Sequence, residues 1–171
     1  MTEKGITLTE LLDSRDRRHE RQQEWLAAMP GATLMVLTVV MPGSVKRNSL
    51  SLDIASAAVK EIKSRFGKHI LRFATFDLNT GYEAFAAIEM PPEQVKRTAC
   101  DIEDSHPLGR LFDIDVFTAD ATPLTRTQFG LPARRCIICG DDARVCMRTR
   151  RHDYDELLNT IQLKVNLFYG R

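Results

Sequence analysis

Residues 32–41, with the sequence ATLMVLTVVM, form an uncharged run that ends at Pro42-Gly43. A short apolar run rich in valine is typical of a strand that is covered on both faces. Proline followed by glycine ends such a strand, because neither residue continues its backbone pattern. We therefore predict a buried strand here, with the remaining elements packed around it.

The segment before this strand predicts a long helix. Thr7 and Glu10 form a T-x-x-E capping box, and apolar residues recur at helical spacing as far as Met29. The middle of the same stripe is polar, with Arg15, Arg18, His19 and Gln22. Either this part overhangs solvent or it borders a polar cleft, and periodicity alone does not distinguish the two.

The segments after the strand complete a recognisable order. They predict a helix capped by Ser49 and ended by Gly67, strands at 69–76 and 82–90, a helix at 91–104 and a strand at 111–118. A last helix is predicted at 154–169. This order is the split β-α-β pattern of ferredoxin-like folds. We therefore predict an α+β fold with a ferredoxin-like β-α-β-β-α-β core, an N-terminal helix and a C-terminal helical tail.

Length and composition favour one domain over residues 1–171, with the helix at 1–30, the α/β core at 32–118 and a tail rich in cysteine and arginine at 119–171. We expect no membrane span and no secretion signal, hence a cytoplasmic protein whose four cysteines are reduced or metal-bound. The net charge of +1 argues against a nucleic-acid partner.

Two acids in the strand at 111–118 are the first candidate site. Side chains two apart in a strand lie on one face, so Asp113 and Asp115 project together, away from Phe112, Ile114 and Val116. Two neighbouring carboxylates repel each other unless a cation lies between them, and Mg²⁺ accepts one or two carboxylates together with substrate phosphates. The alternative is that both acids pair with surface arginines.

Gly109 and Arg110 precede this strand and suit a phosphate group. Glycine allows backbone N–H groups to approach a ligand closely, and arginine can bind two phosphate oxygens at once. The spacing therefore predicts phosphate and metal, without a reaction.

The tail contains a second candidate site. Cys136, Cys139, Cys146 and His152 give the spacing C-x2-C-x6-C-x5-H, with ligands of the type and number that a structural zinc ion takes. Buried reduced thiols are an alternative, since cysteines three apart also suit core packing on a helix. A nucleophilic Cys-His pair is a third option, because an arginine-rich setting lowers a thiol pKa.

Four ordered blocks of the chain resemble the holo-citrate lyase synthase family, also called apo-citrate lyase phosphoribosyl-dephospho-CoA transferases. The most specific block is HPLGRLFDIDV at 106–116. The others are Ser14-Arg15-Asp16 with Arg18, Pro42-Gly43 with Lys46, and the RCIIC segment at 135–139 with Cys146 and His152.

The resemblance implies a nucleotidyltransferase type of reaction. The family takes triphosphoribosyl-dephospho-CoA, bonds its innermost phosphorus to a serine of the citrate lyase acyl carrier subunit and releases pyrophosphate. Asp113 and Asp115 would hold Mg²⁺, and His106 would accept the serine proton or serve as a structural hydrogen-bonder. Glu103 is a further candidate carboxylate. Phosphate and substrate binding would fall to Arg110, Lys46, Arg15, Arg17, Gly109 and Arg135.

Other partners and classes remain open at this point. The basic segment at 134–151 suits an acidic carrier protein. A different carrier, such as that of malonate decarboxylase, fits the same chemistry. A non-catalytic ferredoxin-like module with a zinc-stabilised tail is the alternative from another class.

Overall fold

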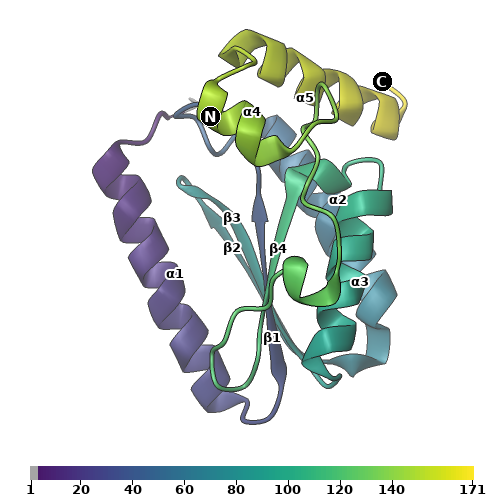
Figure 1. The fold of residues 1–171 in the computed structure, drawn as a ribbon. Helices are drawn as coiled ribbons and strands as arrows, with labels where there is room; N and C mark the ends of the chain where they lie inside the picture. Colours follow the sequence, from purple (N-terminus) through teal and green to yellow (C-terminus); the bar gives the residue numbers. More distant parts are fainter. Residues whose placement is uncertain (1–3) are drawn as a thin grey trace.

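The computed structural model describes residues 4–171, which form a four-stranded antiparallel sheet with helices on both faces (Figure 1). The strands are β1 (Thr33–Val39), β2 (Ile70–Leu78), β3 (Gly81–Ile88) and β4 (Phe112–Phe117). The helices are α1 (Leu8–Ala28), α2 (Ser49–Phe66), α3 (Pro92–Ser105), α4 (Ala143–Thr149) and α5 (Tyr154–Tyr169). Short 3-10 turns lie at Gly67–His69, Gly109–Leu111 and Thr127–Phe129.

The strand order is β2-β3-β1-β4, so β3 lies between β1 and β2, as the split β-α-β pattern requires. The predicted α+β class is confirmed, together with the N-terminal and C-terminal helices. Among residues 4–171, no helix combines the length and the apolar character that a bilayer crossing demands.

The predicted starts of the helices agree with the structure, except at α2. The predicted box at Thr7 is present, since its hydroxyl accepts from the Glu10 N–H and the Glu10 carboxylate accepts from the Thr7 N–H. The prediction that Ser49 caps α2 was wrong. Asn48 is the cap, because its side chain accepts from the Ser51 N–H while the Ser51 hydroxyl accepts from the Asn48 N–H.

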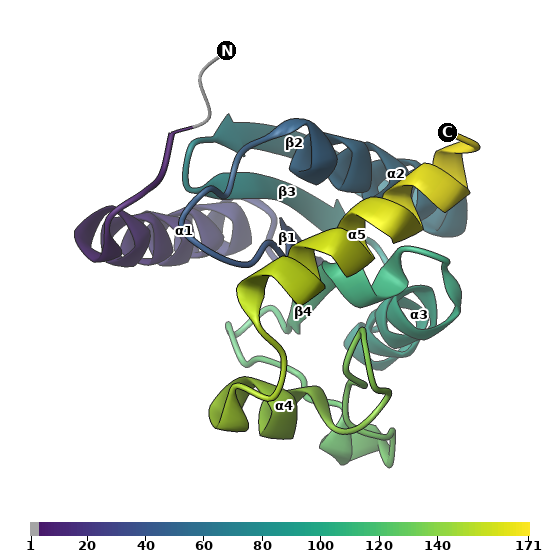
Figure 2. The same ribbon diagram turned by 90° about the horizontal axis from the view of Figure 1, so that it is seen from above.

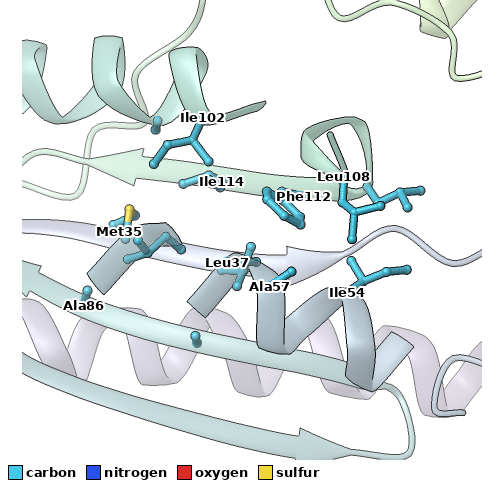
Figure 3. Close-up of a cluster of buried hydrophobic side chains, with 14 of the residues drawn as sticks. Met35, Leu37, Ile54, Ala57, Ala86, Ile102, Leu108, Phe112 and Ile114 are labelled. Carbon is cyan, nitrogen blue, oxygen red and sulfur yellow. The ribbon is translucent and has the colours of Figure 1, made fainter. Parts of the chain in front are cut away.

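The main core lies between the sheet and the helices α2 and α3. Met35 and Leu37 of β1 meet Ile54 of α2, Ile102 of α3 and Ile114 of β4 (Figure 3). Helix α5 adds Ile161 and Val165 to this cluster and lies beside α2 (Figure 2).

Helix α1 covers the opposite face of the sheet. Its Trp25 packs with Leu34 and Val36 of β1 and with Phe85 of β3. The side chains of β1 thus enter two cores alternately, and the prediction of a strand buried on both faces is confirmed. Each face buries apolar area, which is the main favourable term in folding.

Strand β4 lies at an edge of the sheet, and α3 satisfies part of that edge. The buried Glu103 carboxylate accepts from the Ile114 N–H at 2.8 Å and pairs with Arg126 at 2.6 Å. Glu103 therefore binds α3 to β4 with both of its oxygens engaged. An otherwise unpaired edge N–H is satisfied in this way.

Gly109 lets the chain turn tightly against the end of α3. A Cβ atom at this position would lie 2.4 Å from the Glu103 carbonyl oxygen and 2.5 Å from that of Ile102. The requirement for glycine is therefore explained by packing against backbone, whatever its role toward a ligand.

We expect Gly109→Ala to lower the free energy of unfolding by about 1–3 kcal/mol, because the added methyl group has no room. Urea denaturation of both proteins measures the difference. Gly5→Ala is the control, since its Cβ would meet only the Ser44 side chain and no backbone atom. Equal stabilities of Gly109→Ala and wild type would contradict the packing argument.

Candidate functional site

Asp113 and Asp115 lie on the α1 side of β4. Phe112, Ile114 and Val116 point into the core with α2 and α3, so the two acids point to the opposite face. The register pairs Asp113 with Thr38 and Asp115 with Val36 of β1. Since Val36 packs in the cluster beneath Trp25, this face is the one that α1 partly covers.

Asp113 is half exposed and holds one arginine. Its Oδ1 accepts from Arg134 at 2.8 Å, and 47% of the side chain is accessible to solvent. The same guanidinium donates to the carbonyl oxygens of Phe112 and Arg110, at 2.5 and 3.1 Å. Asp113 therefore has an ion-pair partner and is still accessible to solvent. A ligand can still reach it from solvent.

The pKa of Asp115 is raised above its ordinary value. The first cause is reduced hydration by the surrounding protein, although the side chain keeps contact with solvent, and the second is the negative charge of Asp113. The positive charges of Lys96 and Arg18 oppose this shift. A divalent cation between the two carboxylates would remove the repulsion.

Two of the predicted phosphate-binding residues lie near each other on this side. The pKa of Lys46 is lowered by burial and then by the positive charge of Arg15 on α1. Lys46 donates to the Met41 carbonyl at 2.5 Å, while Arg15 is exposed. Arg15 and Arg18 share one flank of α1, because three residues along a helix return to almost the same side.

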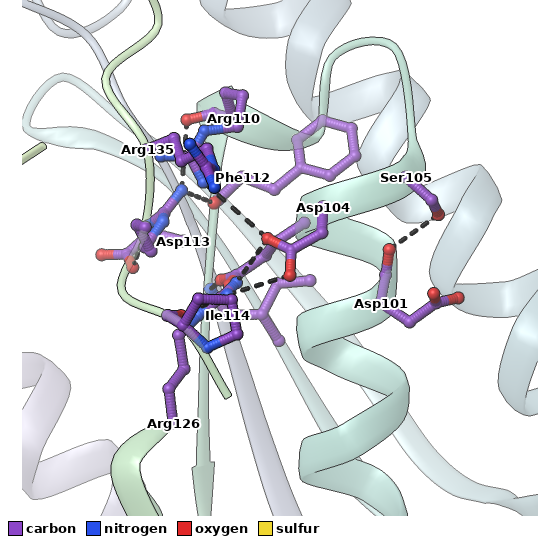
Figure 4. Close-up of polar contacts among 12 residues, drawn as sticks. Asp101, Asp104, Ser105, Arg110, Phe112, Asp113, Ile114, Arg126 and Arg135 are labelled. Atoms are coloured by element: carbon purple, nitrogen blue, oxygen red, sulfur yellow. Dashed lines mark hydrogen bonds and ion pairs between the residues drawn. The ribbon is translucent and has the colours of Figure 1, made fainter. Parts of the chain in front are cut away.

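A second basic group lies at the start of β4. Arg110, Arg135 and Asp104 line a cavity of about 220 Å³ together with Pro132 and Ala133 (Figure 4). The pKa of Arg110 is lowered by burial and by the charge of Arg134. Its Nε atom is buried and has no hydrogen-bond partner within residues 4–171. A small anion would supply that partner.

His106 and Arg17 lie apart from the aspartates. The His106 ring packs against Phe112 and Phe168, on the core side of the sheet, and its Nδ1 accepts from the Leu108 N–H. Burial lowers its pKa. Arg17 lines a different cavity, of about 320 Å³, between α1 and the turn at Asn79. The structure brings Arg15 near Lys46 in one group and Arg110 near Arg135, beside Asp104 of α3, in another, and neither group includes His106 or Arg17.

The four predicted zinc ligands come together in the tail. The ligand atoms of Cys136, Cys139, Cys146 and His152 all lie within 4.8 Å of one another. Residues 137–139 form a turn before α4, so Cys136 and Cys139 do not share a helical face, while the alternative of buried reduced thiols is not tested by this geometry. Cys139 is exposed, whereas Cys136 and Cys146 are buried. This group can hold a metal ion.

The electrostatics of this cluster suit a bound cation. Hydrogen bonding, first from the Asp141 backbone, lowers the pKa of Cys139 to about 6, and burial raises the pKa of Cys146 to about 12. The two sulfurs are 3.4 Å apart. The Nε2 atom of His152 is buried without a hydrogen-bond partner in the described chain. An ion coordinated by these atoms would satisfy that nitrogen.

Sequence reasoning missed two residues that shape the site, Arg134 and Glu83. Arg134 was seen only as one of many arginines in the tail, yet it binds Asp113 and the edge of β4. Glu83 is buried and pairs with Arg18 and Arg21 of α1. In the sequence, Glu83 is a charged residue inside an otherwise apolar strand. Such a residue predicts a buried partner of opposite charge.

The comparisons with known proteins identify the family of the chain. A family model described as apo-citrate lyase phosphoribosyl-dephospho-CoA transferase matches residues 6–167. Relatives with the same description, from Escherichia coli O1:K1 / APEC and Shigella boydii serotype 18, are each 36% identical over 165 residues, covering 95% of this chain and 90% of the relative.

These matches define the class of the protein as a transferase, so the prediction of an enzyme is confirmed. The chain belongs to the apo-citrate lyase phosphoribosyl-dephospho-CoA transferase family, and the resemblance noted in the sequence is confirmed over nearly its whole length.

We expect Asp115→Asn to be more stable than the wild type at neutral pH without added metal. A raised carboxyl pKa means that the folded state binds the proton more tightly than the unfolded state, so ionisation above that pKa lowers stability. The advantage of the variant narrows as the pH falls toward the ordinary value of 3.8. Chemical denaturation across a pH series measures it.

Asp120→Asn is the matched control from the loop after β4. The Thr118 hydroxyl lowers the pKa of Asp120, so this acid favours folding when ionised and its replacement is expected to reduce stability at neutral pH. If both variants lose stability alike, the electrostatic description of Asp115 is wrong.

Proposed function

We propose that the protein transfers the phosphoribosyl-dephospho-CoA group from triphosphoribosyl-dephospho-CoA to a serine of the citrate lyase acyl carrier subunit, in the cytoplasm. The family membership supports the transferred group and the acceptor. The single observation that carries the proposal for the site is the aspartate pair on one open face of β4 with cationic side chains around it.

The reaction is a displacement at phosphorus. The serine oxygen forms a bond to the innermost phosphorus, the bond from that phosphorus to the bridging oxygen breaks, and pyrophosphate leaves with the electron pair of that bond. The serine proton passes to a base. Positioning of the two oxygens and neutralisation of the triphosphate charge provide most of the catalysis in such reactions.

In this proposal Asp113 and Asp115 hold Mg²⁺. The ion would neutralise charge on the phosphate oxygens, and it would relieve the repulsion that raises the pKa of Asp115. The Oδ2 atom of Asp113 would be available to the ion, because Arg134 donates its hydrogen bond to Oδ1. Asp113 combines an ion pair with Arg134, at 2.8 Å, and a half-exposed side chain.

The cations around the pair are assigned to the polyphosphate chain. Lys46 and Arg15 lie together on the α1 side, and their positive charges repel each other. A negatively charged ligand beside both would relieve this repulsion. Arg110 and Arg135 border the cavity at the start of β4, where the buried Nε of Arg110 lacks a partner among residues 4–171. His106 and Arg17 are left out of these roles because of their positions.

We assign zinc to the cysteine cluster. Three sulfur ligands and one imidazole nitrogen are a common donor set for structural zinc, and four protein ligands leave no open position for chemistry. Zinc there would fix the segment from which Arg134 reaches Asp113, since the Arg134 carbonyl accepts from the Ala143 N–H within the same loop. No step of the transfer passes through this ion.

The carrier subunit is proposed to dock beside α4. Arg148 and Arg150 are exposed and make no ion pair with residues 4–171, and Met147 is 76% exposed between Cys146 and Arg148. Exposed positive charge next to an apolar side chain suits an acidic protein surface, because complementary charge raises the rate of encounter.

We expect Asp113→Asn to reduce the transfer rate at least about a hundredfold, because the loss of a metal ligand removes several kcal/mol of transition-state stabilisation. Purified variant, apo carrier subunit, triphosphoribosyl-dephospho-CoA and Mg²⁺ are incubated, and the mass increase of the carrier is followed. Asp120→Asn is the control, since Asp120 lies in the loop beyond β4.

Two outcomes contradict this proposal. Near-normal, Mg²⁺-dependent transfer by Asp113→Asn would remove the metal role. Modification of the apo carrier of malonate decarboxylase, with none of the citrate lyase carrier, would show that the acceptor was assigned wrongly.

We expect the protein to be purified with close to one zinc ion per chain, and Cys139→Ser to lose it together with thermal stability. The reason is that a structural zinc ion contributes its binding free energy to folding. Metal analysis and the melting temperature are measured for both proteins. Cys100→Ser is the control, because Cys100 lies on α3 outside the cluster. Zinc content that is unchanged in Cys139→Ser would refute the assignment.

A further inference from the structure

The buried carboxylate Glu83 holds two arginines under α1. Glu83 lies on β3, and its Oε1 accepts from Arg18 Nε while its Oε2 accepts from Arg21 Nη1, both at 2.9 Å. Only 4% of the Glu83 side chain is exposed. One negative charge shared by two positive charges leaves an excess positive charge between α1 and the sheet. An excess charge in a partly buried place favours an anion beside it.

This cluster lies in the same row of the sheet as the aspartates. Thr38 of β1 is paired with Glu83 on one side and with Asp113 on the other. Side chains at paired positions of neighbouring strands lie on the same face. Glu83, Thr38 and Asp113 thus cross the face that α1 partly covers. The excess positive charge therefore lies on the same face of the sheet as Asp113, with one strand between them.

The two arginines are directed differently. The Arg21 guanidinium lies over the Phe76 ring of β2, 3.9 Å from its centre, and Arg21 lines the cavity on the hairpin side of α1. Within the described part of the chain Arg18 does not line that cavity; it lies on the flank of α1 that carries Arg15, and its positive charge lowers the pKa of Asp115 on β4. Arg18 binds Glu83 through Nε alone, so its two terminal nitrogens make no hydrogen bond with residues 4–171. These donors are available to a ligand.

We propose that Arg18 is a further phosphate-binding residue of the site and that Glu83 is its positioning residue. The ligand class is a polyphosphate, and the inference rests on the proposed function for the identity of the natural substrate. Arg18 offers two N–H-bearing nitrogens to phosphate oxygens from the α1 side. Glu83 fixes the guanidinium by its Nε, so that less side-chain freedom is lost when the ligand binds.

The rival explanation is that Glu83, Arg18 and Arg21 only fasten α1 to the sheet. In that case neither arginine affects phosphate binding, because each only makes an ion pair with the same carboxylate. Under our proposal they differ, because Arg21 is directed to Phe76 and the hairpin-side cavity, whereas Arg18 is not.

The test compares Arg18→Met with Arg21→Met. Each variant keeps the apolar stem and leaves Glu83 paired with the other arginine, so both are expected to fold with similar losses in melting temperature. The dissociation constant for inorganic tripolyphosphate with Mg²⁺ is measured by calorimetry. We expect it to rise about tenfold or more in Arg18→Met and to stay within about twofold in Arg21→Met.

Steady-state kinetics give a second measurement. Arg18→Met is expected to raise the KM for triphosphoribosyl-dephospho-CoA about tenfold, with the KM for the carrier subunit unchanged, whereas a loss of anchoring alone lowers stability and leaves both KM values as they were. Glu83→Gln is expected to raise the same KM by a smaller factor, and Glu83→Asp to restore part of it. If either Met variant fails to fold, Arg18→Lys and Arg21→Lys replace the pair.

Equal effects of the two arginine variants on tripolyphosphate binding would overturn the inference, as would no effect of Arg18→Met. The proposed function fails separately. If the wild type modifies no carrier but binds tripolyphosphate in an Arg18-dependent manner, the reaction was assigned wrongly and the phosphate-binding residue stands.

Discussion

The alternation of side chains along β4 is the constraint on which the site depends. Phe112, Ile114 and Val116 are buried among α2 and α3, and this burial compels Asp113 and Asp115 to point the other way. A shift of one residue in register would place both acids in the core and is therefore excluded by the cost of burying two charges. The apolar side of the strand thus determines the position of the polar side.

An edge strand also needs its outer backbone groups satisfied, and the chain does so with charged side chains. Glu103 accepts from the Ile114 N–H, and Arg134 donates to the carbonyls of Phe112 and Arg110. Arg126 joins Glu103 and Asp104 to the loop after β4. Although burial alone would lower the pKa of Arg126, hydrogen bonds to Asp104 and Glu103 raise it, so the cation is firmly held. The edge is covered, and the tail is anchored where the aspartates begin.

The fold was largely predictable because its signals are local. Capping residues, the turn at residues 79–81 and the period of apolar residues gave every strand of the sheet and the long helices. The exception at the start of α2 shows the limit, since Asn48 and Ser49 are both good caps and only the reciprocal bond from Ser51 selects Asn48. The residues of the Cys3His cluster were likewise local in sequence, and their convergence was predicted from spacing alone.

The site was predictable only in part, because its partners come from distant segments. Asp113 and Asp115 follow from the strand period, but the pairing of Asp113 with Arg134 depends on how a loop returns to the sheet. The polar stripe on α1 left two explanations open, and Arg18 with Glu83 favours the one in which α1 borders a polar site. His106 does not lie beside the two aspartates, and the sequence could not show this for a similar reason. Nothing in the HPLGR block shows that its ring would pack on the core side against Phe112 and Phe168.

Under the proposed function, the charges around β4 would favour a metal ion and a polyphosphate bound together. Without a ligand, Arg134, Arg18 and Lys96 offset part of the charge of Asp113 and Asp115. A lone divalent cation would meet these positive side chains, and a lone polyphosphate would meet the two carboxylates. A magnesium polyphosphate would satisfy both sets, because the acids would hold the cation and the arginines and Lys46 would bind the phosphate oxygens. Under the proposed function, selection for the complex over either component is therefore a property of this arrangement of charge.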